Sequence, residues 1–109
     1  MSSRVMFAIL SALSLTGLAA CQRPDAGSGA MMYRATCATC HDPGSTPQAP
    51  DLTQLAALNG GPFPMDRVTQ VIDGRAGLRA HGSPMPVWGA VLTPPEVRSL
   101  TAYLATIQQ

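Results

Sequence analysis

The sequence predicts an all-α protein of about four short helices. Apolar residues recur at three- and four-residue intervals in several segments, which is the spacing of one face of a helix. No segment alternates polar and apolar residues convincingly, as a half-buried strand would. The chain also contains ten glycines and ten prolines, and clusters of these residues punctuate the periodic segments as turns and loops do.

The first three helices are expected in the first two thirds of the chain. One spans about 29–36. A second spans 52–58, where leucine recurs every third residue, and Asn59-Gly60-Gly61 ends it. A third spans about 65–73, with valine and isoleucine on one face and Gly74 as its stop.

The last helix has the clearest start signal. Thr93 and Glu96 form a capping box, and Pro94 occupies the first helical position that proline favours. One apolar stripe then follows at helical spacing, made by Val97, Leu100, Leu104 and Ile107.

A CxxCH motif stands at the end of the first predicted helix, as Cys37-Ala38-Thr39-Cys40-His41. This run is typical of c-type haem attachment, in which two thiols add to the vinyl groups of one haem and the histidine binds its iron. A CxxC redox pair or half a zinc site would be alternatives. Zinc would need a second ligand pair, but the other cysteine and histidine, Cys21 and His81, are far apart. No βαβ pattern surrounds Cys37, so we expect one covalently bound haem c.

The N-terminus has the layout of a secretory signal. Arg4 precedes an apolar run over 5–18, which is near the ~7–15 residues of a signal and short of the ~18–20 needed to span a bilayer. Leu18-Ala19-Ala20-Cys21 resembles the bacterial lipobox, in which the cysteine is lipidated and becomes the mature N-terminus. Ordinary cleavage near Ala20 is the alternative, and it would leave Cys21 as a free thiol in an oxidising compartment.

These signals predict three parts of the chain: a lipoprotein-type signal peptide over 1–20, a flexible tether over 21–28, and one domain over 29–109. The tether prediction depends on its polar residues with proline and glycine. The expected location is the bacterial periplasm, with a lipid anchor in either the inner or the outer membrane.

Charge excludes one class of partner. Without residues 1–20 the chain keeps six arginines, no lysine and six acidic residues, so it lacks the clustered basic face of a nucleic-acid-binding protein. A sparse basic rim remains an alternative to isolated surface charges for five arginines: Arg34, Arg67, Arg75, Arg79 and Arg98.

With the motif and helices in place, residues 29–109 resemble the class I, monohaem cytochromes c, here in a bacterial lipoprotein form. That family crosses its first and last helices through a glycine, an aromatic residue four positions later, and a leucine–aromatic pair. Gly29 and Tyr33 match the first two positions, and Leu100 with Tyr103 matches the pair. The glycine allows close approach of two helix backbones.

The resemblance also implies the axial ligands of the haem iron. His41 would be the fifth ligand, with its other ring nitrogen bonded to the backbone carbonyl of Pro50. The segment 83–89, Ser-Pro-Met-Pro-Val-Trp-Gly, resembles the family's methionine loop and makes Met85 the expected sixth ligand. His81 is the competing sixth ligand.

Two further residues are expected near the haem. Trp88, through its indole N–H, and Arg75, through its charge, would hydrogen-bond a haem propionate. Packing and an ordinary surface charge would explain these two residues equally well.

Histidine–methionine ligation implies an electron carrier, because both axial positions are filled. We expect a periplasm-facing, membrane-anchored cytochrome that carries single electrons between dehydrogenases or quinol-oxidising complexes and an oxidase or another cytochrome. It would use no small-molecule substrate and would not be an enzyme by itself. The alternatives are a cytochrome subunit of a multisubunit dehydrogenase or oxidase, or a haem sensor or peroxidase with a labile sixth ligand.

Overall fold

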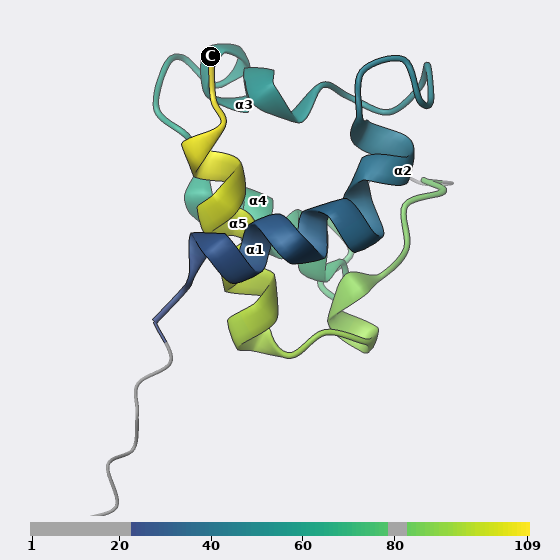
Figure 1. The fold of residues 1–109 in the computed structure, drawn as a ribbon, viewed down its shortest axis with the longest axis vertical. Coiled ribbons are helices and arrows are strands. Elements are labelled where there is room, and N and C mark those ends of the chain that lie inside the picture. The colour runs from purple at the N-terminus through teal and green to yellow at the C-terminus, as the bar shows by residue number, and fades with distance from the viewer. Residues whose placement is uncertain (1–22, 79–82) are drawn as a thin grey trace, which may run out of the picture.

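The computed structural model describes residues 23–78 and 83–109, and these residues form helices without any strand. The all-α prediction is therefore confirmed. Figure 1 shows the helices and connecting loops in space. The elements in order are α1 (Ala26–Met32), η1 (Tyr33–Cys37), α2 (Ala38–His41), η2 (Leu52–Gln54), α3 (Leu55–Leu58), α4 (Met65–Asp73), η3 (Trp88–Ala90) and α5 (Pro94–Thr106).

The first helix begins earlier than the sequence predicted. The Asp25 carboxylate accepts hydrogen bonds from the backbone N–H groups of Gly27 and Ser28, at 3.1 and 2.9 Å. This is an N-cap, which satisfies N–H groups that have no partner within the helix. Residues 26–28, which the sequence predicted to be part of the tether over 21–28, form the first turn of α1.

The helix widens where it approaches the CxxCH motif. Tyr33–Cys37 is a π-helical segment, η1, and the N–H of Ala38 bonds to the carbonyl of Tyr33, five residues earlier. Within it, the Thr36 hydroxyl donates to the Met32 carbonyl at 2.7 Å. Such a side-chain bond competes with the backbone ladder and often bends a helix, and short π segments are frequent at functional sites.

The other three predicted helices are present. Residues 52–58 are helical but divide into a 3₁₀ turn, η2, and a single α-helical turn, α3. Helix α4 has the predicted bounds and ends at Gly74, whose φ of 72° is left-handed. At the start of α5, the Glu96 carboxylate accepts from both the N–H and the hydroxyl of Thr93, each at 2.7 Å.

Helices α1 and α5 cross in close contact at Gly29, as the resemblance predicted. A Cβ added at Gly29 would lie only 2.0 Å from the backbone oxygen of Ser99 and 2.8 Å from the Cβ of Tyr103. Beside this crossing, the rings of Tyr33 and Tyr103 pack with their centroids 5.3 Å apart. That separation is typical of stabilising aromatic pairs.

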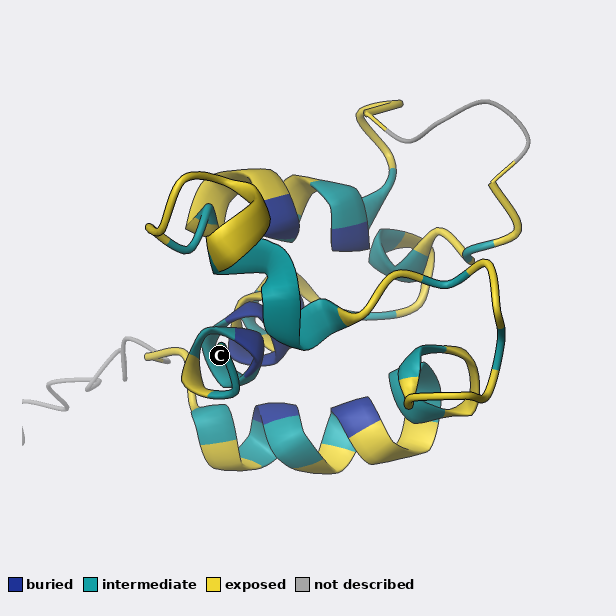
Figure 2. Cartoon of the chain, turned by 90° about the horizontal axis from the view of Figure 1, so that it is seen from above, coloured by how far each residue is buried: buried dark blue, intermediate teal, exposed yellow. Residues whose placement is uncertain are grey.

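The buried core lies between three helices. Figure 2 shows α1 and α4 on opposite sides of α5, with their buried residues turned inward. Among the described residues, the buried hydrophobic side chains are Tyr33, Val68, Ile72, Val97, Leu100 and Leu104. So small a core leaves many hydrophobic side chains half-exposed.

The predicted signal peptide and Cys21 lie outside the described residues. In the part of the chain that the structure describes, no helix has the length and hydropathy needed to cross a membrane.

Candidate functional site

The two thiols of the CxxCH motif lie in different surroundings. Cys37 ends η1 and is half-buried, whereas Cys40 lies on α2 and is exposed. Burial raises the pKa of the Cys37 thiol above its ordinary value, and a hydrogen bond with Thr36, whose Oγ1 lies 3.3 Å from the sulfur, opposes the rise. Neither cysteine forms a disulfide, so both are available for thioether bonds.

The contact between His41 and Pro50 determines which ring nitrogen carries the hydrogen. Its Nδ1 lies 3.0 Å from the carbonyl oxygen of Pro50, the pair of atoms expected from the sequence. A carbonyl only accepts hydrogen bonds, so Nδ1 carries the hydrogen. In the neutral imidazole, Nε2 is then unprotonated and offers its lone pair to a metal. This is the usual arrangement of a metal-binding histidine whose second nitrogen is fixed by a neighbour.

The loop that follows His41 is fixed at its first residue by the helix before it. The hydroxyl of Tyr33, on η1, donates to the carboxylate of Asp42 at 3.1 Å. Burial, and secondly this hydrogen bond, raise the pKa of Tyr33 to about 12. The phenol therefore stays protonated as a donor at any physiological pH. Sequence reasoning used Tyr33 only for helix packing and missed this bond.

In Figure 1, the segment that contains Met85 lies on the same side of the view as α2, the helix that ends with His41. This segment, residues 83–87, is drawn there in light green. Met85 is partly buried against the hydrophobic core, and its backbone N–H donates to the hydroxyl of Ser83 at 3.4 Å. His81, the competing ligand, falls outside the described residues, so the assignment of Met85 stays a prediction.

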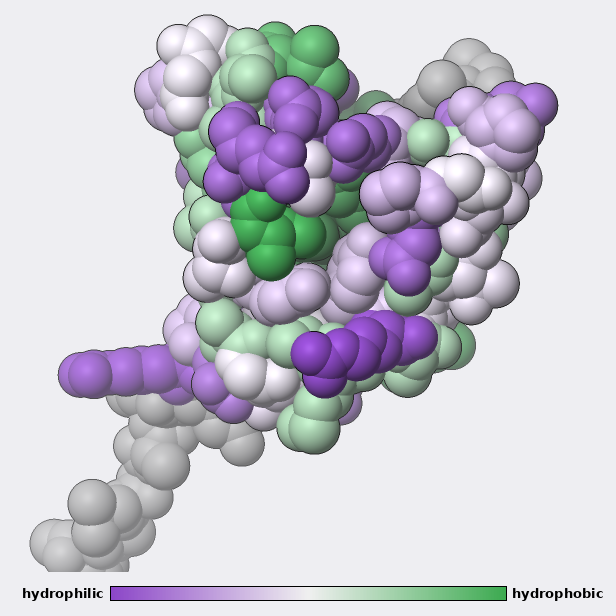
Figure 3. Space-filling model, turned by 45° about the horizontal axis from the view of Figure 1, so that its top comes forward, coloured by the Kyte–Doolittle hydropathy of each residue, from purple (hydrophilic) through white to green (hydrophobic). Residues whose placement is uncertain are grey.

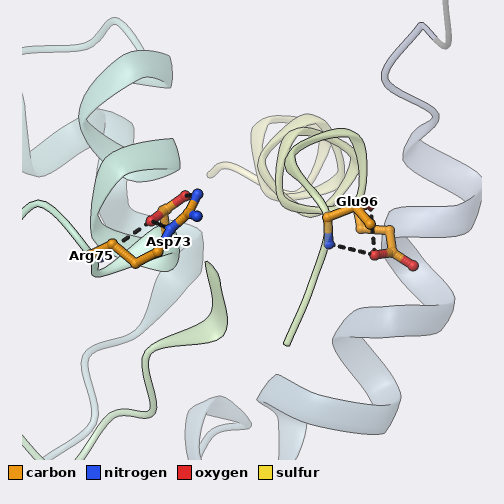
Figure 4. A network of polar contacts seen from close by, with 4 residues as sticks. Asp73, Arg75 and Glu96 are labelled. Carbon is orange, nitrogen blue, oxygen red and sulfur yellow. Dashed lines mark hydrogen bonds and ion pairs between the residues drawn. The ribbon is translucent and has the colours of Figure 1, made fainter. Parts of the chain in front are cut away.

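The two expected propionate partners differ in their surroundings. Trp88 is half-buried and packs against the core. Arg75 forms a two-point ion pair with Asp73, through Nε to Oδ1 and Nη2 to Oδ2, both at 2.7 Å (Figure 4). The pairing lowers the pKa of Asp73 to about 2. The ion pair uses two of the five N–H donors of the guanidinium. The contact of Arg75 with a haem propionate stays a prediction.

The packing around Gly89 explains why the methionine loop ends in glycine. A Cβ at this position would lie 2.5 Å from Oδ1 of Asp73 and 2.7 Å from Nε of Arg75. The missing side chain thus lets η3 pack directly on the ion pair. Sequence reasoning missed the role of Gly89 and of Asp73, because the contact joins residues that are sixteen positions apart.

The residues present fit a covalently bound haem. Two thiols and an imidazole with a fixed tautomer lie on one continuous helical segment. In Figure 3 the surface is hollowed between two raised lobes, with hydrophobic side chains in part of the hollow. The described residues contain no cluster of three or more histidine, cysteine, aspartate or glutamate side chains that could hold a metal ion. A shell of partly buried hydrophobic residues, which a flat apolar group could cover, surrounds the core: Met32, Cys37, Ala38, Leu52, Leu55, Phe63, Met85, Trp88, Leu92, Tyr103 and Ile107.

Comparisons with known proteins agree with this chemistry. Residues 24–104 match the family described as cytochrome c oxidase, cbb3-type, subunit III. The chain is 36% identical over 101 residues to the cbb3-type cytochrome c oxidase subunit FixP of Azorhizobium caulinodans. That alignment covers 86% of this chain but only 31% of FixP. No solved structure matches the chain. The chain therefore belongs to the family of subunit III of cbb3-type cytochrome c oxidases, and it is a c-type cytochrome domain that carries electrons.

Proposed function

We propose that this chain carries single electrons within a cbb3-type oxidase, through one haem joined to Cys37 and Cys40 and ligated by His41 and Met85. The observation that carries the proposal is the 3.0 Å contact between Nδ1 of His41 and the Pro50 carbonyl. That contact leaves Nε2 as the metal-binding nitrogen on the residue that directly follows the two thiols.

The residues suit electron transfer better than chemistry on a substrate. A bound haem supplies a reversible one-electron change at its iron. His41 holds one axial position with its ring orientation fixed. Met85 would fill the other with a thioether, which raises the potential and leaves no open coordination position. The proposed role is therefore outer-sphere electron transfer.

Membership of an oxidase is favoured over a freely diffusing carrier. The family and the relative are both subunits of an oxidase. The matched region spans about a third of the length of FixP. The redox partners of this chain would be neighbouring subunits of the oxidase. Other respiratory cytochromes are the alternative partners. The lipobox-like Leu18–Cys21 would anchor the domain to a membrane on its periplasmic side.

The ligand assignment is tested by single substitutions in the holoprotein. Met85→Ala should abolish the iron–sulfur charge-transfer band of the oxidised protein and make the reduced iron bind carbon monoxide. His81→Ala is the control and should leave both properties unchanged. The opposite pattern would assign the sixth position to His81.

The place of the chain in an oxidase is tested by its association. Affinity purification of the full-length chain from its own membranes should recover a cytochrome oxidase with bound high-spin haem. Recovery of the chain alone, with rapid reduction by several soluble cytochromes, would favour the independent carrier. Cys21→Ser should release the protein from the membrane fraction if the cysteine is lipidated, and mass determination would detect the lipid directly.

A further inference from the structure

The side chain of Gln108 joins the C-terminal end of the domain to the segment formed by η2 and α3. Its amide nitrogen donates to the carbonyls of Leu52 and Leu104, at 2.8 and 2.7 Å. Its amide oxygen accepts from the backbone N–H of Ala56 at 2.9 Å. Only this orientation of the amide satisfies all three backbone groups, because carbonyls accept and an N–H donates. Figure 1 shows the C-terminus beside α3, where these bonds lie.

The segment that Gln108 holds begins just after Pro50. Asp51 caps it, and its Oδ1 accepts from the N–H and the hydroxyl of Thr53, at 2.9 and 2.7 Å. The Thr53 carbonyl in turn accepts from the backbone N–H of Gln109 at 3.0 Å. The ring of Pro50 fixes its own φ. The Asp51 cap and the bonds from Gln108 and Gln109 thus hold the backbone from Pro50 to Ala56 against the C-terminal residues.

The other end of the loop is attached to the preceding helical segment at Asp42, which bonds to the Ala38 carbonyl and to the Tyr33 hydroxyl, at 3.0 and 3.1 Å. Between His41 and Pro50, the backbone hydrogen bonds include two turns, Ser45 N–H to Asp42 O and Ala49 N–H to Thr46 O, both at 3.0 Å. These bonds shape the loop locally between Asp42 and Ala49. Pro50 stands eight residues after Asp42 and directly precedes the segment that Gln108 holds, so that segment is the nearer restraint on the Pro50 carbonyl.

We propose that Gln108 is a positioning residue for the axial histidine. It holds the turn after Pro50 so that the Pro50 carbonyl accepts the Nδ1 hydrogen of His41. This inference rests on the proposed function, because it takes His41 as the iron ligand. A strong hydrogen bond at Nδ1 makes the imidazole a better electron donor, which favours the oxidised iron. Loss of the Gln108 bonds should weaken that hydrogen bond and raise the reduction potential.

The test compares two adjacent glutamines. Gln108→Met keeps a long unbranched side chain without its hydrogen bonds. Gln109→Met is the matched control, because Gln109 contributes its backbone N–H, which the substitution retains. In the holoprotein, Gln108→Met should raise the potential and speed exchange of the His41 Nδ1 hydrogen by about two- to tenfold, the effect of losing roughly one net hydrogen bond. Gln109→Met should match the wild type in both measurements.

Gln108→Glu gives a second, independent test that also serves if Gln108→Met does not fold. A protonated carboxyl both donates and accepts, so it preserves some of the hydrogen bonds that the Gln108 amide makes to the backbone. The ionised form only accepts. Exchange of the His41 Nδ1 hydrogen should therefore approach the wild-type rate at low pH and accelerate as the introduced carboxyl ionises. Gln109→Glu, which adds the same charge one residue away, should show no such step.

The possible failures are distinguishable. A wild-type protein that binds haem through His41, together with Gln108 variants that match their Gln109 counterparts in potential and exchange, would overturn the positioning role alone. A wild-type protein without covalent haem, or with haem that His41 does not ligate, would refute the proposed function and this inference with it.

Discussion

The crossing of α1 and α5 at Gly29 predicts a large penalty for a single methyl group. A Cβ in Gly29→Ala would lie 2.0 Å from the Ser99 oxygen and 2.7 Å from the Ser99 carbonyl carbon. Ordinary carbon–oxygen contacts are about 3.3 Å or longer. The obstructing atoms are backbone atoms and cannot rotate away, so the two helices must move apart by about 1 Å.

The magnitude follows from two opposing effects. Overpacking a core costs about 1–3 kcal/mol and occasionally more, and the rigid contact at Ser99 places this site at the upper end. Alanine has a better helix propensity than glycine, which offsets the destabilisation by about 1 kcal/mol. The net destabilisation should therefore be about 2 kcal/mol or more, which lowers the melting temperature by roughly 8–16 °C in a domain of this size.

Gly27→Ala is the matched control, because it lies in the same helix. Its Cβ would approach nothing closer than an oxygen of Asp25 at 3.4 Å, which is ordinary contact. Guanidinium unfolding of the haem-loaded protein, followed by circular dichroism, measures both variants. Gly27→Ala should be as stable as the wild type or slightly more stable. If Gly29→Ala proved equal to Gly27→Ala in stability, the close crossing would be refuted.

Two further predictions concern pH and the polar contacts. Tyr33→Phe removes the hydroxyl that donates a hydrogen bond to the Asp42 carboxylate and should cost about 1 kcal/mol of stability at neutral pH. The pKa of Tyr33 is raised from 10.0 to about 12, so its contribution to stability is complete below pH 10 and is lost as pH rises toward 12. Base titration of the unfolding free energy should show a shallower decline in Tyr33→Phe, and equal slopes would contradict burial of the phenol. At acid pH, the pKa of Asp73 is lowered from 3.8 to about 2 by its bonds with Arg75, so its contribution is present above pH 3.8 and is lost as pH falls toward 2. Asp73→Asn should reduce the loss of stability over that interval, and an unchanged acid profile would show that the ion pair does not form in solution.

The helices that carry local signals could be predicted from the sequence. Helix α4 has its predicted bounds because Gly74 provides a left-handed stop. The capping box of Thr93 and Glu96 likewise marks the start of α5. The crossing of α1 and α5 at Gly29 could be predicted from the family resemblance, because Gly29 and Tyr33 stand at the expected spacing.

Features that depend on distant contacts could not be predicted in this way. The early start of α1 is a different case, because its signal is local: Asp25 is a favoured N-cap residue that the tether interpretation treated as part of a linker. The amide of Gln108 bonds to groups 52 and 56 positions away, and no local pattern marks such a bond. The packing of Gly89 on Asp73 and Arg75 also requires three-dimensional information.

The most direct test of the central claim is the absorption spectrum of the reduced, purified holoprotein before and after addition of carbon monoxide. A covalent haem that His41 and Met85 ligate on both sides predicts the sharp bands of a low-spin c-type haem, unchanged by the gas. A colourless protein, or bands that shift at once when carbon monoxide is added, would contradict the account.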